Sequence, residues 1–283
     1  MSKTPQRPAT VRRGAGDAPE VPQGSPNLTQ TTMSRLRRFN LYMALLHTGQ
    51  ALLMIWLSSG FALPVTTSFL YFDQASRSLR PRPETLYDLR IGPAVAAFLL
   101  ISALAHLALA SPLLYPRYSQ WAAKGVNPVR WVEYSLSSSL MIALIAMLVG
   151  IYDLAALIAI FGVNACMILF GWAMEHYNQG DARPDWLAYW FGVFAGAVPW
   201  IAIGIYLFGA GVASASPPPA FVYAIYGSLF VFFNVFALNM VLQYRGTGPW
   251  RRPMFSERVY MILSLAAKSA LAWQVFAGTL RPM

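Results

Sequence analysis

The chain has 283 residues, of which 57% are hydrophobic and only 11% are charged, whereas about 25% are charged in ordinary soluble domains. This deficit indicates lipid as the main solvent and argues against a soluble enzyme. The net charge of +10 does not indicate a nucleic-acid partner, because the basic residues lie in one terminal stretch and at the ends of apolar runs. The single Cys166 excludes an intrachain disulfide.

Residues 1–38 are rich in Pro, Gly, Ser, Thr and Arg, so we expect a disordered basic tail that cannot bury a core. Residues 39–283 are expected to form one membrane domain, because their apolar runs reach the roughly 20 residues that a membrane helix needs. The sequence therefore predicts an all-α membrane protein, a bundle of seven transmembrane helices. The predicted spans cover residues 39–62, 91–114, 129–151, 154–174, 186–208, 220–243 and 256–280.

The connections between these spans carry turn or charge signals. In the first, "LPVTTSFLYF" is rich in β-branched and aromatic residues, which favours a short β-hairpin outside the bilayer. The second, "YPRYSQWAAKGVNP", is expected to be a loop. The N-terminal stretch and the second, fourth and sixth connections together hold 15 of the 21 Lys and Arg residues, whereas the first connection and the C-terminal end together hold five. The chain is therefore expected in the cell membrane as a multi-pass protein, with a cytoplasmic N-terminus and an extracellular C-terminus.

Ionisable side chains are rare inside the predicted spans. Lys268 lies in the middle of the seventh, and His47 and His106 lie in the first two. Glu133 is the only acidic residue expected inside a span, because the others lie in loops, in the tail, or at or beyond helix ends. A lysine at the centre of a membrane helix costs about 3 kcal/mol or more, so these groups are expected to face one another inside the bundle. The alternatives are a structural ion pair and ordinary core histidines.

A lysine in an apolar pocket is a good candidate for a Schiff base, because desolvation exposes its free amine. Once an aldehyde is attached, the protonated imine needs a nearby anion, and Glu133 is the internal carboxylate that could supply it. A lysine and a helix-3 carboxylate in a bundle of seven helices look like a retinal-binding rhodopsin.

Several stretches closely resemble the heliorhodopsin family, and the resemblance runs from about Arg38 to Leu280. They are "HTGQALLM", "SALAH", "RWVEYSLSSSLM", "FFNVFALN" and "SLAAKSALAW". The resemblance implies an N-terminus in the cytoplasm, in agreement with the charge distribution. It also implies a homodimer formed with the help of an outer hairpin.

The resemblance assigns a role to individual residues. Lys268 would carry all-trans-retinal as a protonated Schiff base, with Glu133 as its counterion and Ser264 hydrogen-bonded near the imine. A polar network that accommodates the proton after light absorption would comprise His47, Ser102, His106 and Arg130. The walls of the retinal pocket would include Ser138, Met141, Trp200, Phe233, Asn234 and Trp273, although packing alone is an alternative for the aromatic residues.

Helix 3 argues against a proton pump. Microbial pumps resemble one another in having a Thr four residues after the carboxylate and a second carboxylate seven residues further, where this chain has Ser137 and Leu144. A pump needs an ordered relay of ionisable groups. We therefore expect a light sensor in which the Schiff base loses its proton internally and a slow conformational change reaches a cytoplasmic partner. The alternatives are a light-gated or light-driven ion conductor, and a proton-coupled transporter that uses Lys268 and Glu133.

Overall fold

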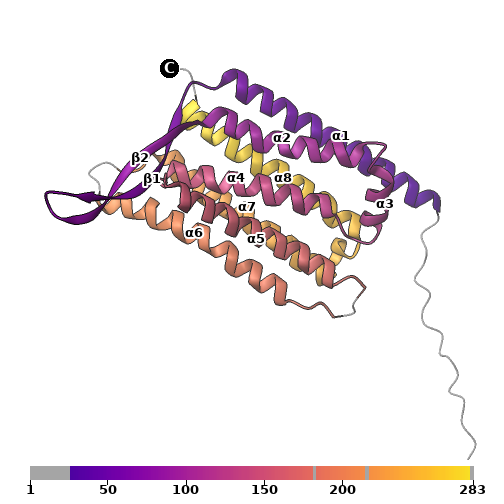
Figure 1. The fold of residues 1–283 in the computed structure, drawn as a ribbon. Helices are drawn as coiled ribbons and strands as arrows, with labels where there is room; N and C mark the ends of the chain where they lie inside the picture. Colours follow the sequence, from indigo (N-terminus) through magenta and orange to yellow (C-terminus); the bar gives the residue numbers. More distant parts are fainter. Residues whose placement is uncertain (1–25, 181–182, 214–216, 281–283) are drawn as a thin grey trace, which may run out of the picture.

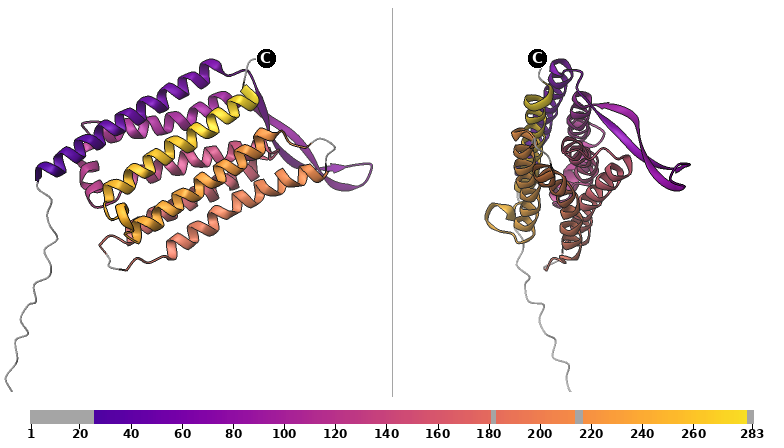
Figure 2. Two further views of the ribbon diagram at one scale, coloured as in Figure 1. Left: turned by 180° about the vertical axis from the view of Figure 1, so that it is seen from behind. Right: turned by 90° about the vertical axis from the view of Figure 1, so that its left-hand side faces the viewer.

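The structure, a computed structural model, describes residues 26–180, 183–213 and 217–280. Within these residues, long helices lie side by side in one bundle (Figures 1 and 2). They are α1 (Pro26–Leu57), α2 (Ile91–Ala110), α4 (Pro128–Leu148), α5 (Leu154–Tyr177), α6 (Leu187–Ala213), α7 (Ala220–Tyr244) and α8 (Pro253–Val275). A short helix α3 (Tyr115–Ala123) and the helical turns η1 (Gly248–Arg251) and η2 (Phe276–Leu280) complete the helical elements.

Six of the long helices, α2 and α4 to α8, are long and apolar enough to cross a membrane. The chain is therefore a multi-pass membrane protein. Helix α1 covers most of the predicted span 39–62 but is not among the six, because Asn40, His47 and Gln50 lower its hydropathy. It also ends at Leu57, earlier than predicted, since a β-strand begins at Ala62.

The first connection forms the predicted β-hairpin, which projects from one end of the bundle (Figure 1). Strands β1 (Ala62–Asp73) and β2 (Ser78–Arg90) pair antiparallel, with one irregularity between Val65 and Thr66. The Asp73 side chain accepts hydrogen bonds from Ala75 N and Ser76 Oγ in the turn, and these bonds lower the pKa of the Asp73 carboxyl.

The base of the hairpin is fixed to the bundle by backbone hydrogen bonds. Thr66 N donates to the carbonyl oxygen of Tyr152, and Ser59 N, just before β1, donates to that of Leu280. We call this end of the bundle the hairpin end. The opposite end carries α3, the start of α1 and the start of α8, and we call it the α3 end (Figure 1).

Two segments differ from the sequence predictions. Residues 115–123, which were expected to lie in a loop, form α3, in which Pro116 occupies the first turn, where proline is tolerated. Helix α1 begins at Pro26, so residues 26–38, assigned to the tail, are helical. The rest of the expected tail, residues 1–25, lies outside the described residues.

Helix α4 is the most enclosed of the six apolar helices, with 61% of its apolar window buried, whereas α5 and α7 have 17%. Its first turn is set by Asn127, whose side chain accepts from Arg130 N, and by Pro128. Helix α4 packs against α2 and α5, and α6 packs mainly against α5. The central helix therefore carries Glu133 to the middle of the bundle.

Candidate functional site

Lys268 of α8 and Glu133 of α4 form an ion pair inside the bundle. Lys268 Nζ lies 3.0 Å from Glu133 Oε1, and the two residues are only 3% and 6% exposed. Lys268 Nζ also donates to Ser264 Oγ at 2.7 Å, one helical turn earlier on the same face of α8. Ser102 Oγ of α2 donates to Glu133 Oε1 at 2.5 Å. The structure thus brings together four of the residues that the sequence singled out.

The two predicted histidines lie beside each other. The rings of His47 on α1 and His106 on α2 are stacked, with centroids 5.7 Å apart and planes inclined by 12°. His106 is one helical turn from Ser102, the residue that contacts Glu133. His106 Nδ1 lies 2.8 Å from Asn40 Oδ1, whereas neither ring nitrogen of His47 has a hydrogen-bond partner among the described residues.

A second polar cluster lies towards the α3 end. Arg130 NH2 lies 3.0 Å from Glu175 Oε2, and Arg130 NH1 donates to Glu257 Oε2. Trp131 Nε1 donates to Glu175, while Asn127 Nδ2 donates to Glu257 Oε1 at 2.6 Å. All five residues are buried, so the two carboxylates and the guanidinium share an enclosed site.

This cluster bears on two expectations about charged residues. The resemblance assigns Arg130 to the network with His47, Ser102 and His106, and in the structure its side chain contacts Glu175 and Glu257. These two acids were placed at or beyond helix ends, although α5 continues past Glu175 and α8 begins before Glu257. Arg130 was the signal in the sequence that could have pointed to these acids, because a cation inside an apolar helix requires a buried anion beside it.

The α3-end cluster is joined to the histidines by two residues that sequence analysis missed. Tyr118 OH on α3 donates to Glu257 Oε1 at 3.1 Å, and Asn40 Nδ2 on α1 donates to Tyr118 OH at 3.4 Å. Burial and the negative charge of Glu257 raise the pKa of Tyr118 well above its ordinary value, so the phenol keeps its proton. A continuous set of hydrogen bonds therefore runs from Glu257 to His106.

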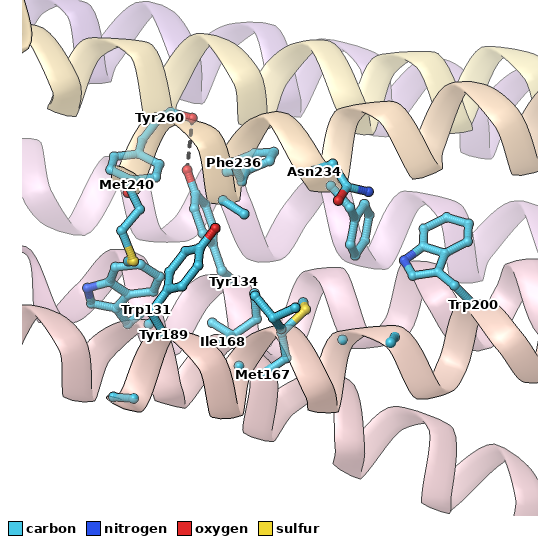
Figure 3. A pocket seen from close by; sticks show the side chains of 18 of the residues that line it. Trp131, Tyr134, Met167, Ile168, Tyr189, Trp200, Asn234, Phe236, Met240 and Tyr260 are labelled. Carbon is cyan, nitrogen blue, oxygen red and sulfur yellow. Dashed lines mark hydrogen bonds between the residues drawn. The ribbon is translucent and has the colours of Figure 1, made fainter. Parts of the chain in front are cut away.

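A small cavity lies beside Lys268, and a larger cavity adjoins it. The smaller, of about 50 Å³, is lined by Lys268, Ser264, Ser138 and Met141, as the sequence predicted for the last two. The larger, of about 260 Å³, lies between α4, α5, α6 and α7 and includes the predicted residues Trp200, Phe233 and Asn234 (Figure 3). The cavities share the side chains of Tyr134, Met167, Ile168, Phe233 and Phe236.

Trp273 does not line either cavity, contrary to prediction. Its side chain is 37% exposed, and its Nε1 donates to Gln50 Oε1 of α1 at 3.2 Å. On α8, Trp273 lies five residues beyond Lys268, so it projects about 140° away from Lys268 around the helix. Spacing along a helix therefore explains why a conspicuous aromatic residue near the lysine is not part of its pocket.

Small residues and aromatic rings shape the larger cavity. A Cβ at Gly171 would lie 2.6 Å from the Trp131 ring, so only glycine allows α5 to approach that ring. Tyr134 OH donates to the carbonyl oxygen of Tyr260 at 2.9 Å, which fixes the Tyr134 ring (Figure 3). Lys268 Nζ lies 5.0 Å from the centroid of this ring. An aromatic face at this distance attracts a cation.

These features fit retinal. A buried amine adjoins a carboxylate that can balance a cationic linkage, and an apolar, aromatic-lined space begins at the same amine. In a multi-pass helical membrane protein, this combination defines a retinal-binding protein of the rhodopsin type.

The comparison with known families agrees with this class. The heliorhodopsin family model matches residues 36–280, so the chain belongs to the heliorhodopsin family. No curated protein sequence matches the chain.

Proposed function

We propose that the protein is a light sensor in which Lys268 binds all-trans-retinal covalently and Glu133 is the counterion of the linkage. The observation that carries this proposal is the buried ion pair between Lys268 and Glu133 at the cavities. Ser264 would hold the Nζ atom in place, and Ser102 would keep Glu133 oriented by its 2.5 Å hydrogen bond. Retinal, when bound, supplies light absorption and an isomerisation that shifts the proton affinity at Nζ.

The walls of the cavities select an extended apolar ligand. Ser138 and Met141 lie near the attachment point, whereas Trp200, Phe233 and Asn234 lie in the larger cavity. Trp200 packs edge-to-face on Phe230 and Phe233, with ring centroids 5.4 Å apart, which stiffens that end of the cavity. These side chains exclude water and fix the position of the ligand.

The proton that leaves Lys268 Nζ would stay inside the protein. Glu133, Ser102, His106 and His47 lie beside it in the direction of the α3 end. In the opposite direction, Leu144 occupies the position where pumps carry a second carboxylate, and it is 1% exposed. The proton therefore returns to Nζ without net transport, and a slow conformational change is the output.

The orientation in the membrane is part of the proposal. We place α1 as the seventh span, because it lies along α2 and brings His47 to the polar interior. The α3 end would face the cytoplasm, since Arg35, Arg38, Arg117 and Lys124 are exposed there. The C-terminus would be extracellular, and the exposed basic residues at the α3 end would contact a cytoplasmic signalling partner.

A homodimer is also proposed, with the hairpin as part of its interface. Strand β1 exposes Phe69, Leu70, Tyr71 and Phe72 in succession. A run of large apolar side chains on an exposed hairpin is typical of an interaction surface. Crosslinking in native membranes tests this proposal, and a monomer in native membranes would contradict it.

The absorption spectrum tests the attachment site. The full chain, expressed with all-trans-retinal, is expected to show a visible band that is absent in Lys268→Ala. Lys124→Ala is the matched control, because Lys124 is exposed in the turn after α3 and should leave the band unchanged. Folded wild-type protein without a band would overturn the proposal and favour the transporter alternative.

Transport assays test the absence of pumping. Illuminated cell suspensions should show no change of external pH. A light-induced pH change that a protonophore abolishes would contradict the sensor proposal, and a light-induced current would favour the ion conductor.

A further inference from the structure

Asn40 is buried at the junction between the histidine pair and the α3-end cluster, and nothing in the sequence analysis gave it a role. Its side chain is 0% exposed. Its Nδ2 atom donates to the Leu36 carbonyl oxygen at 3.0 Å and to Tyr118 OH at 3.4 Å. Its Oδ1 atom faces His106 Nδ1 at 2.8 Å.

The partners of Asn40 determine the orientation of its amide group. A carbonyl oxygen can only accept a hydrogen bond, so the atom that faces Leu36 O must be the amide nitrogen. The amide oxygen then faces His106, and this oxygen can also only accept. His106 Nδ1 must therefore carry a hydrogen.

The tautomer of His106 follows from this assignment. A neutral imidazole with a hydrogen on Nδ1 has its lone pair on Nε2, and that nitrogen is the one free to accept a proton. The surrounding groups are His47 of α1, Glu133 of α4, Lys268 of α8 and, on its own helix, Ser102. Since both nitrogens of His47 lack a hydrogen-bond partner among the described residues, His106 is the histidine whose tautomer is fixed by a side-chain hydrogen bond.

The hydrogen bonds between His106 and Glu257 also run in a single direction. His106 donates to Asn40, Asn40 donates to Tyr118, and Tyr118 donates to Glu257. A positive charge on His106 at one end and the Glu257 carboxylate at the other strengthen every bond between them.

We infer that Asn40 is a positioning residue that holds His106 as the Nδ1–H tautomer, makes its Nε2 the internal proton acceptor, and transmits the resulting charge to Tyr118 and Glu257. The inference rests on the proposed function in one respect, namely that a proton leaves Lys268 and stays inside the protein. The tautomer itself is a property of the dark state and does not depend on that function.

Nitrogen NMR of the full chain, labelled with 15N-histidine and kept in the dark, tests the tautomer directly. The chain has three histidines, so His106→Gln identifies the His106 signals by their loss. The wild-type spectrum should show a protonated Nδ1 and an unprotonated Nε2 for His106. A protonated Nε2 with an unprotonated Nδ1 would overturn the inference, whatever the variants show.

Variants of Asn40 test its role. Asn40→Leu should shift His106 from the Nδ1–H form to a mixture or to the Nε2–H form. Asn40→Asp, protonated in this buried position, retains a carbonyl acceptor for His106 and a donor for Leu36, and should restore the wild-type tautomer. Gln50→Leu, also on α1 but bonded to Trp273, should leave the His106 signals unchanged.

Light-induced difference spectra of the labelled protein give the second readout. Asn40→Leu should lower the ratio of protonated to neutral His106 in the long-lived intermediate about tenfold, because a hydrogen bond to a charged group contributes about 1.5 kcal/mol or more. An unchanged tautomer or an unchanged protonated fraction in folded Asn40→Leu would contradict the inference. The visible band reports retinal attachment separately, so failure of the proposed function and failure of this inference can be distinguished.

Discussion

The two halves of the bundle on either side of Lys268 differ in chemistry. Towards the α3 end lie two histidines, a guanidinium, two further carboxylates and the hydrogen bonds that connect them. Towards the hairpin end, the described helix segments contain no Asp, Glu, Lys, Arg or His, and one apolar cluster fills the interior. Buried residues of that cluster include Phe98, Leu99, Ile142, Leu144, Ile145, Leu271 and Val275.

Under the proposed function, this difference would let the protein move a proton internally without transporting it. A charged group entering the apolar half would lose its hydration without gaining a partner, which costs several kcal/mol. In the polar half, Glu133, His106 and Glu257 already have partners that can respond to a new charge. In the proposed sensor, the apolar half would be the barrier to the proton, and the polar half would receive it.

The substitution with the largest expected effect is at Glu133, where the two halves meet. Glu133→Gln leaves the cation at Lys268 Nζ without its anion, and removal of one partner of a buried pair costs about 3–5 kcal/mol. The linkage should then lose its proton at neutral pH, and absorption should move from the visible to the near ultraviolet. Glu84→Gln on the exposed hairpin is the control. A visible band of unchanged position in Glu133→Gln would show that another group is the counterion.

A comparable loss of stability is expected inside the polar half. Arg130→Met leaves Glu175 and Glu257 as two buried carboxylates without a cation, with an expected cost of about 3–5 kcal/mol. Thermal unfolding in detergent measures it, with the exposed Arg117→Met as control. The triple variant that adds Glu175→Gln and Glu257→Gln should regain much of the loss. Equal unfolding midpoints for Arg130→Met and wild type would show that the cluster contributes nothing to the stability of the fold.

The apolar half can be tested by adding a charge to it. Leu144→Asp places a carboxyl group in the interior, at a cost of about 3 kcal/mol for an ionised group in a membrane helix. Leu144→Asn, of nearly equal size but uncharged, should be less destabilised at neutral pH. If the thermal unfolding midpoints of the two variants coincide at all pH values, the aspartate is either protonated or paired with another group in the interior. The hairpin end would then be a weaker barrier than its composition indicates.

Sequence reasoning reached the apolar half and the ion pair more fully than the polar half. Hydropathy locates six of the spans, and the mid-helix position of Lys268 requires an anion, for which Glu133 was the internal acid available. Asn40, Tyr118, Glu175 and Glu257 were missed for a physical reason. Glu175 and Glu257 lie near helix ends, Tyr118 lies on the short helix α3, and Asn40 lies at the edge of the predicted span 39–62, all places where polar residues are ordinary. Only the tertiary packing of α1, α3, α5 and α8 buries them together.

The smallest expected effect comes from Tyr118, the link between the two parts of the polar half. Tyr118→Phe removes one hydrogen bond to Glu257 and should cost about 1 kcal/mol at neutral pH.

Because the pKa of Tyr118 is raised in the folded protein, the neutral phenol contributes stability that is fully present below the unfolded pKa of about 10. This contribution is lost as the pH rises above that value, so wild-type stability should fall more steeply than that of Tyr118→Phe. Thermal unfolding measured across the alkaline range, with the exposed Tyr42→Phe as control, tests this. If the curves of stability against pH are parallel for wild type and Tyr118→Phe, water reaches Tyr118. The enclosed hydrogen-bonded connection from Asn40 to Glu257 would then be contradicted.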